Sequence, residues 1–309
     1  MSEATATPAL PARASRALSG YALVAIAACS WGTWPVFLRH AEAIAPVPVA
    51  LESAVVMIVL TLVSAPFCLR DRVPVRATPA QWLAVAWLGI ADALNVILFF
   101  AAYKHTSVAV AVLTHYLTPI LVALGAPFLL GEKVRARTVL AVALSFAGLV
   151  LLLRPWGAER RPDDWLGAAL GAGSAVFYAS NVLVNKRLAG VFSGSELSFY
   201  HGLVAAPLLA SLVPPAAWGQ VHLEAFKFLL AGSITAGGLA SLCFVWGLRR
   251  VHASHASTLT LLEPLVAVTL AAVLLGEPLA VGSAAGAVLI LAGSGIVISS
   301  RAAAVVAPA

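Results

Sequence analysis

A few ionisable side chains lie inside long apolar segments of this sequence, and these are the residues able to do chemistry. They are Asp92, His115, His201 and Glu263, with Glu52 nearer the end of such a segment. An ionisable group surrounded by lipid costs at least a few kcal/mol, so it is expected to face a cavity or a partner. These side chains are therefore candidates for binding a polar solute or a proton.

Asp92 and Asn95 are three residues apart and share one helix face, which Phe99 continues one turn later. One interpretation is a cavity wall whose acid binds a substrate amine. The alternative is a buried hydrogen-bond network between helices, because polar residues also hold membrane helices together.

Two prolines follow polar residues at corresponding places. His115 and Thr118 precede Pro119, and Glu263 precedes Pro264. Proline removes one backbone hydrogen bond and loosens the preceding turn, so we predict a hinge or kink at each position. A static packing kink is the alternative reading. Glu263 is the stronger functional candidate because an unpaired carboxylate at mid-bilayer depth is costly.

Aromatic residues with helical spacing predict further cavity walls. Trp34 lies several residues inside the first apolar segment, Tyr178 and Asn181 share one face of another, and Trp246 lies on a third. Aromatic rings suit flat substrates and can face a cation, although interfacial anchoring is the alternative. The predicted substrate-binding residues are Trp34, Asp92, Asn95, His115, Tyr178, Asn181, Trp246 and Glu263.

The sequence lacks the common catalytic and metal-binding motifs. It has no phosphate-binding loop for ATP, no His-Glu-x-x-His, no Gly-x-Ser-x-Gly and no cysteine pair. We therefore predict no catalytic residue, no metal, no cofactor and no enzymatic activity. The rival hypotheses are an intramembrane enzyme, for which Asp92 with His115 is the one pair available, and a non-transporting scaffold.

The composition requires a membrane. Hydrophobic residues make up 61% of the 309 and charged residues 10%, against about 25% charged in soluble domains. The net charge of +6 does not indicate nucleic-acid binding, because the charges lie between long apolar runs, where they set membrane orientation.

Ten apolar segments are long enough, or nearly so, to span a bilayer. The fifth is short and the seventh contains His201. The predicted spans are 20–38, 47–69, 80–102, 107–130, 138–153, 165–188, 196–212, 225–247, 253–275 and 279–299. Most of the 19 lysines and arginines fall on the inside if both termini are cytoplasmic.

The tetrapeptide Leu-Leu-Gly-Glu occurs twice, ending at Glu132 and Glu277, and the same spacing pairs Pro119 with Pro264. We infer two homologous halves of five spans each, which an odd number of spans places in opposite orientations. The predicted parts are a disordered cytoplasmic tail (1–19), a first repeat (20–153), an extracytoplasmic linker (154–164), a second repeat (165–300) and a cytoplasmic tail (301–309).

With these features the chain resembles the EamA family of the drug/metabolite transporter superfamily. The residues that carry the resemblance are the paired Pro…Leu-Leu-Gly-Glu segments, Trp31-Gly32, and Arg39 matched by Lys186. It implies a basket of ten helices, in two inverted repeats, around a central cavity. Glu52 stands where family members often carry arginine. The Trp31–Pro35 run is similar to that of bacterial exporters of aromatic amino acids.

We therefore expect an all-α exporter of small zwitterionic metabolites, with amino acids including aromatic ones as substrates, in the inner membrane of a bacterium. The mechanism would be alternating access, with protons as a candidate coupling ion. The other partners would be the substrate and the lipid bilayer. An exporter of drugs, nucleosides or sugar conjugates is the rival within transport, but a phosphorylated substrate would need a cavity lysine or arginine, and none lies in mid-span.

Overall fold

The computed structural model describes residues 12–74, 76–157, 162–276 and 281–306, and every regular element in these ranges is a helix. The helices are α1 (Ala12–Trp31), α2 (Trp34–Glu42), α3 (Val49–Arg70), α4 (Pro79–His105), α5 (Val108–His115), α6 (Thr118–Leu130), α7 (Ala136–Leu153), η1 (Pro155–Gly157), α8 (Asp164–Arg187), α9 (Gly194–Ala210), α10 (Pro215–Gly219), α11 (Leu223–Gly232), the π-helix η2 (Ser233–Leu239), α12 (Ala240–Leu248), α13 (Ala253–Leu259), α14 (Leu262–Leu275) and α15 (Val281–Val306).

Nine helical segments within the described residues are long and apolar enough to cross a membrane, which confirms a multi-pass membrane protein. The seventh predicted span, 196–212, is α9, which has 17 residues. At 1.5 Å per residue it is about 26 Å long, slightly less than the roughly 30 Å of a bilayer's apolar core. The ten-span arrangement therefore stays a prediction.

The ends of the chain differ from the expectation where they are described. α1 begins at Ala12 and α15 continues to Val306, so parts of both predicted tails are helical. Alanine-rich sequence explains the extension, because alanine has the highest helix propensity. Residues 1–11, and with them most of the N-terminal tail, lie outside the described residues, as does Glu277.

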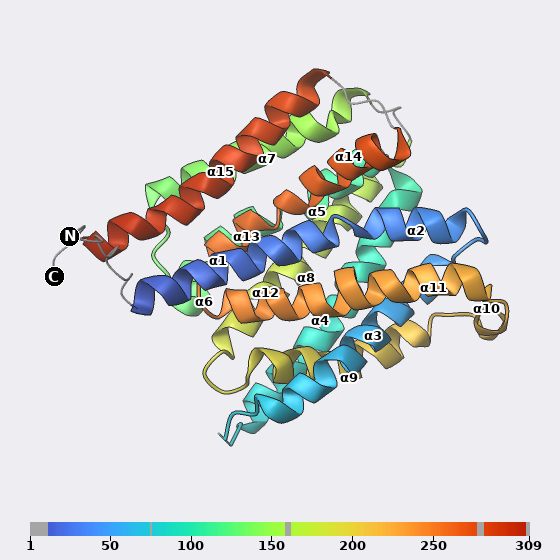
Figure 1. Ribbon diagram of the computed structural model, residues 1–309, viewed down its shortest axis with the longest axis horizontal. Helices are drawn as coiled ribbons and strands as arrows, with labels where there is room; N and C mark the ends of the chain where they lie inside the picture. Colours follow the sequence, from blue (N-terminus) through green and yellow to red (C-terminus); the bar gives the residue numbers. More distant parts are fainter. Residues whose placement is uncertain (1–11, 75, 158–161, 277–280, 307–309) are drawn as a thin grey trace, which may run out of the picture.

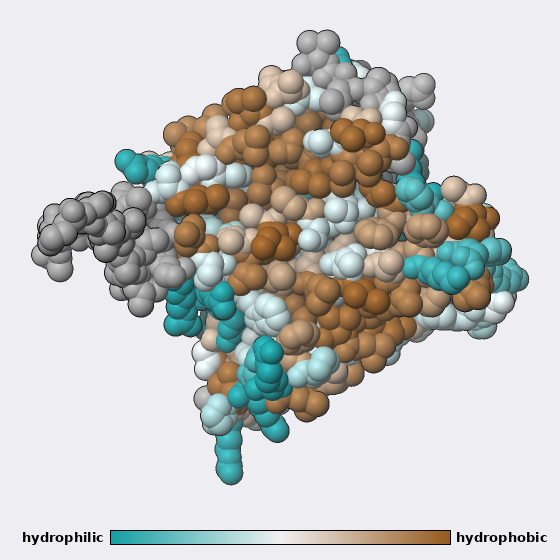
Figure 2. All heavy atoms as spheres, viewed as in Figure 1, coloured by the Kyte–Doolittle hydropathy of each residue, from teal (hydrophilic) through white to brown (hydrophobic). Residues whose placement is uncertain are grey.

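The surface matches a bilayer. Figure 2 shows apolar residues over the middle of the visible face and hydrophilic residues gathered toward its ends. Large apolar side chains such as Leu69, Leu83 and Phe128 are strongly exposed. In water so much exposed apolar surface would be unfavourable, whereas lipid tails solvate it.

The helices associate in pairs. α7 packs along α15, α3 along α9, α4 along α8, and α1 along α12 (Figure 1). Glycine permits the closest approach: a Cβ on Gly148 of α7 would lie 2.7 Å from the Gly286 carbonyl oxygen of α15, and a Cβ on Gly286 would lie 2.6 Å from that of Gly148. Small residues at such contacts are typical of membrane helix packing.

The repeated Leu-Leu-Gly-Glu motif ends helices. Gly131 and Gly276 follow α6 and α14 with φ of 66° and 70°, a left-handed conformation that favours glycine. Glu132 comes next, and its carboxylate accepts hydrogen bonds from the amide of Ala253 at 2.9 and 3.2 Å. The first copy of the motif therefore stops one helix and caps another, α13.

Candidate functional site

Three of the membrane-spanning segments are interrupted near the middle. The interruptions separate α1 from α2, α5 from α6 and α13 from α14. In each turn a threonine hydroxyl donates to the carbonyl three residues earlier. The pairs are Thr33 with Ser30 (2.7 Å), Thr118 with His115 (2.8 Å) and Thr260 with Ser257 (2.7 Å).

A proline lies shortly after each of these threonines. The three are Pro35, two residues after its threonine, Pro119, directly after it, and Pro264, four residues after it. Because proline has no N–H, the carbonyl four residues earlier loses its helical donor. At the second interruption that carbonyl belongs to His115, and the Thr118 hydroxyl supplies the missing hydrogen bond. A hinge or kink was predicted at Pro119 and at Pro264, and a helix boundary lies just before each of them. The break at Pro35 was not anticipated.

The first and third interruptions touch each other. A Cβ on Gly32 would lie 2.6 Å from the carbonyl oxygen of Glu263 and 2.7 Å from Cβ of Val266. The absence of a side chain at Gly32 is what lets α1 reach the start of α14. Glu263 is therefore held against the break in the first membrane helix.

Glu263 is half-buried and lies among tyrosines from three other elements. The Tyr116 hydroxyl, in the turn between α5 and α6, interacts directly with the Glu263 carboxyl group. Tyr178 of α8 and Tyr103 of α4 lie within its electrostatic range. The hydroxyls supply the polar neighbours that a carboxyl group needs inside a membrane protein.

His115 is buried within the same group of aromatic rings. Its ring stacks on Tyr178 with centroids 5.5 Å apart and planes 9° apart, and it packs on Phe99 at 4.3 Å. Its Nδ1 lies 2.7 Å from Ser174 Oγ, and that hydroxyl also lies within hydrogen-bond distance of the Gly171 carbonyl. The serine hydroxyl and the ring nitrogen can each serve as donor or acceptor in this contact, which holds the His115 ring beside Tyr178.

Asp92 pairs with His201. Asp92 Oδ2 lies 3.4 Å from His201 Nε2, while Nδ1 of the same ring is 3.0 Å from the carbonyl of Leu197. A carbonyl can only accept, so Nδ1 carries a hydrogen. Nε2 and the carboxylate then attract each other only if one more proton lies on one of them. The pair joins α4 to α9 through two ionisable side chains.

Glu52 lies near a span end, as the sequence predicted, and is linked to the same region. It lies in the first turn of α3, is 3% exposed, and accepts a hydrogen bond from Trp34 Nε1 at 2.8 Å. Tyr103 lies within electrostatic range of both Glu52 and Glu263, so one tyrosine links the two acids.

Of the two predicted asparagines, Asn181 makes a contact between helices and Asn95 has an acceptor left unsatisfied by the described residues. Asn181 Nδ2 donates to the Leu88 carbonyl at 3.2 Å and ties α8 to α4. The Oδ1 atom of Asn95 is buried without a hydrogen-bond partner in the part of the chain that the structure describes. This orphaned acceptor lies one turn from Asp92.

Trp246 lies elsewhere, contrary to its predicted place in the central group. Its Nε1 donates to Ser195 Oγ at 3.0 Å, at the start of α9, and its ring packs edge-on against Phe67 at 5.4 Å. Ser195 in turn donates to Asp71, which follows the end of α3. The hydrogen bond from Arg70 lowers the pKa of Asp71 below its usual value. Trp246 is thus anchored near the polar end of the helices, as membrane tryptophans often are.

We call the group made by Trp34, Glu52, Asp92, Phe99, Tyr103, His115, Tyr116, Tyr178, His201 and Glu263 the central cluster. Among the described residues, no lysine or arginine takes part in these contacts. Lys186 is engaged elsewhere, donating to the carbonyls of Leu248 and Val251 at 2.8 and 2.6 Å. The central cluster therefore consists mainly of carboxyl groups and aromatic rings.

The pair that an intramembrane enzyme would need is not assembled. Asp92 contacts His201, and His115 contacts Ser174, so the two predicted partners face different groups. No set of three or more His, Cys, Asp or Glu side chains in the described ranges could hold a metal ion.

Five members of the cluster were not among the predicted binding residues, and one of them, Phe99, was noted only as continuing the face of Asp92. Tyr103 lies one turn beyond Phe99 on the helix face that carries Asp92, so helical spacing could have identified it. Tyr116 adjoins His115, but helical spacing cannot place it because the helix breaks there. His201 and Glu52 were noted only as ionisable residues in apolar segments, without partners.

Comparison with known proteins gives three results. The model of the EamA-like transporter family matches residues 18–154 and 165–299. An uncharacterized transporter from Archaeoglobus fulgidus is 30% identical over 229 residues, which cover 74% of this chain and 78% of that protein. A riboflavin transporter from Rhizobium johnstonii is 27% identical over 178 residues, or 57% of each protein.

A crystal structure of another protein superposes with a TM-score of 0.76, covering 93% of this chain and 99% of that chain at 22% identity. At this level of identity the similarity concerns the fold alone. It shows that this arrangement of helices occurs in a protein of nearly the same extent.

Proposed function

Since the chain belongs to the EamA-like transporter family, we propose that it carries a small, flat aromatic solute of neutral or positive charge across the membrane. The central cluster is the proposed binding site. The observation that carries this proposal is the set of three carboxyl groups, on Glu52, Asp92 and Glu263, among stacked rings and without a cationic side chain among the contacts described.

Electrostatics favours this substrate class. Rings such as His115 and Tyr178 stack on flat molecules, and carboxylates attract a cation strongly where little water screens them. An anionic substrate would meet repulsion from the same acids with no arginine to compensate. This argues against phosphorylated conjugates.

Two solutes of this class are specific candidates. An aromatic amino acid, the substrate expected from the sequence, would place its ammonium group at Glu263 or Asp92. A flavin-like ring is supported by the relatives named riboflavin transporters and by the aromatic stacking around His115. Such a ring is neutral and needs hydrogen bonds, which the His115 Nε2 and the tyrosine hydroxyls can supply.

Alternating access between two inverted halves is the proposed mechanism. The pairing of helices supports it, because the pattern of contacts stays the same when the predicted halves are exchanged. α3 with α9 and α7 with α15 each pair two equivalent spans. The contact of α1 with α12 in turn corresponds to that of α4 with α8. The interruptions would be the flexible points. Export, cytoplasmic termini and an inner-membrane location complete the proposal.

Counterflow in reconstituted vesicles tests the function. Vesicles loaded with unlabelled riboflavin, or with an unlabelled aromatic amino acid, should accumulate the labelled form of the solute that is carried. Glu263→Gln should reduce accumulation at least tenfold, a barrier change of about 1.4 kcal/mol. Glu224→Gln, on an exposed carboxylate that pairs with Lys227, is the matched control. Full activity of Glu263→Gln, or no accumulation of any aromatic solute, would contradict the proposal.

A further inference from the structure

A pocket of about 440 Å³ lies outside the central cluster, between the α3–α4 connection and the start of α9. Its volume is within the roughly 300–1,000 Å³ of small-molecule sites. Its lining combines two arginines, one glutamate and three aromatic rings. The residues that line it and carry the argument are Arg72, Arg76, Trp82, Phe192, Glu196 and Tyr200.

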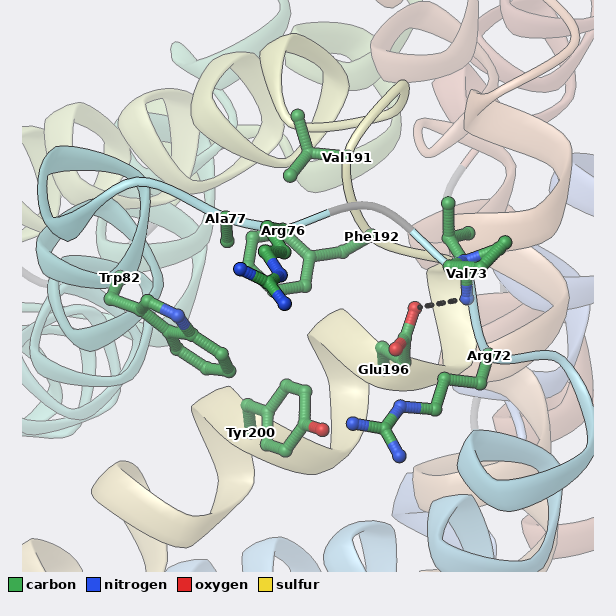
Figure 3. A pocket seen from close by; sticks show the side chains of 10 residues that line it. Arg72, Val73, Arg76, Ala77, Trp82, Val191, Phe192, Glu196 and Tyr200 are labelled. Atoms are coloured by element: carbon green, nitrogen blue, oxygen red, sulfur yellow. Dashed lines mark hydrogen bonds between the residues drawn. The ribbon is translucent and has the colours of Figure 1, made fainter.

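The two arginines are exposed and have no acidic partner among the described residues. Figure 3 shows their guanidinium groups on two sides of the Tyr200 ring. Arg70, by contrast, is paired with Asp71 at 2.9 Å. The pocket therefore presents two unneutralised positive charges, and guanidinium groups suit the geometry of a phosphate.

The glutamate in the pocket does not neutralise them. Glu196 is 4% exposed, and its Oε2 accepts from the amides of Ser193 and Val73 at 2.7 and 3.2 Å. The bond from Val73 ties the α3–α4 connection to the beginning of α9 (Figure 3). Glu196 thereby fixes the pocket wall and leaves the arginines available to a ligand.

The floor of the pocket is a rigid aromatic cluster. The Trp82 ring packs edge-on against Phe192 at 5.0 Å and against Tyr200 at 5.1 Å. Trp82 is 45% exposed and lies in the first two turns of α4, at the helix end where aromatic residues meet the headgroup region. Exposed leucines continue from it: Leu83 follows Trp82, and Leu203 lies one turn after Tyr200. An acyl chain can lie on these leucines while its headgroup reaches the arginines.

We propose that this pocket binds the phosphate headgroup of an anionic phospholipid. Arg72 and Arg76 would hold the phosphate, the Trp82–Phe192–Tyr200 cluster would support the glycerol region, and the exposed leucines would contact the acyl chains. The positive charge around it predicts that this face is cytoplasmic, and the cytoplasmic leaflet is the one that carries the negative surface potential. Anionic lipid would then fasten the α3–α4 connection to α9.

Titration of purified protein in a neutral detergent with dihexanoyl phosphatidylglycerol, read as binding by native mass spectrometry, tests this site. The double variant Arg72→Gln/Arg76→Gln should bind roughly thirtyfold more weakly, because each basic side chain near an anionic headgroup contributes about fivefold. The double variant Arg135→Gln/Arg137→Gln removes the same charge outside the pocket, at the start of α7, and should bind normally. Arg72→Lys/Arg76→Lys keeps the charge and should retain most of the affinity.

Two further ligands distinguish the source of the phosphate. Dihexanoyl phosphatidylcholine should bind more weakly than the phosphatidylglycerol, because its headgroup carries no net charge. Glycerol phosphate should bind more weakly than either lipid, because it lacks the apolar contacts. Equal weakening in both glutamine double variants, equal binding of the two lipids, or glycerol phosphate binding as tightly as phosphatidylglycerol would overturn the proposal.

Discussion

At the scale of single residues, the Asp92–His201 pair is the strongest candidate for proton coupling. The Leu197 carbonyl fixes the hydrogen of His201 on Nδ1, so a hydrogen bond between Nε2 and Asp92, which are 3.4 Å apart, would form only with one further proton, the one we propose for coupling. In Asp92→Asn the side-chain amide can donate to Nε2 permanently, which imitates the protonated pair.

We therefore expect Asp92→Asn to abolish accumulation driven by a pH gradient while counterflow at equal pH continues. Both are measured in the same vesicles with labelled solute. Glu224→Gln is the control for loss of an exposed carboxylate. If Asp92→Asn still responds to the gradient like the unchanged protein, the pair does not carry the coupling proton.

The stack of His115 on Tyr178 predicts a contribution of ring area to solute binding. Tyr178→Leu should weaken the apparent affinity for an aromatic solute by about two- to tenfold. This range corresponds to the contribution of one aromatic pair, about 0.5–1.5 kcal/mol. Tyr178→Phe keeps the ring and should lose less. Concentration dependence of counterflow measures both, and equal losses in the two variants would show that the stack serves helix packing.

Sequence reasoning found the central residues better than it found their partners. Asp92, His115, Tyr178 and Glu263 stood out because polar or aromatic groups in apolar segments are costly or conspicuous. Their contacts depend on how separate helices pack, which spacing along one helix does not encode. Trp246 was misplaced for this reason: its ring meets Phe67 and Ser195 across helix boundaries.

At the scale of helices, the threonine–proline turns predict flexibility at defined positions. Pro119 lies within the first two residues of α6, directly after the interruption, whereas Pro127 lies inside α6 without breaking it. Pro119→Ala restores an amide that can donate to the His115 carbonyl and should extend the helix through the turn.

Pro119→Ala should consequently leave the thermal unfolding temperature unchanged or raised while transport turnover falls by roughly fivefold, or about 1 kcal/mol in the barrier. Pro127→Ala is the matched control and should transport at the normal rate. Turnover in vesicles and thermal unfolding in detergent give the two readouts. Equal turnover in both variants would indicate that the interruption is a static kink.

The sequence was informative about where helices end and less so about how long they are. Gly131 and Gly276 stop α6 and α14 because each adopts a left-handed conformation after an apolar run. α9 is bounded by a capping box of Ser193 and Glu196, which starts it at Gly194, and it ends at Ala210, so it lies two residues earlier than the predicted span. The Pro35 break was not predicted because the apolar segment 20–38 was interpreted as one continuous span.

At the scale of the whole molecule, hydrogen bonds join the two predicted halves at one end. Glu132 accepts from the Ala253 amide, and His255 contacts both the Tyr21 hydroxyl at 2.7 Å and Thr138 Oγ1 at 3.1 Å. The positive charge predicts that this end is cytoplasmic. If the halves separate at this end during transport, these bonds must break, so we expect them to stabilise the conformation in which the halves are joined here.

Glu132→Ala should therefore shift the protein toward an arrangement open at this end. A hydrogen bond to a carboxylate contributes about 1.5–3 kcal/mol, so amide exchange in α13 should accelerate by about tenfold or more. Exchange in the turn between α5 and α6 should accelerate as well, because water gains access to the central cluster. Hydrogen–deuterium exchange by mass spectrometry measures both segments, with Glu224→Ala as the control. Faster exchange confined to α13 would assign Glu132 to local capping alone, and unchanged exchange in both segments would remove it from the closure of this face.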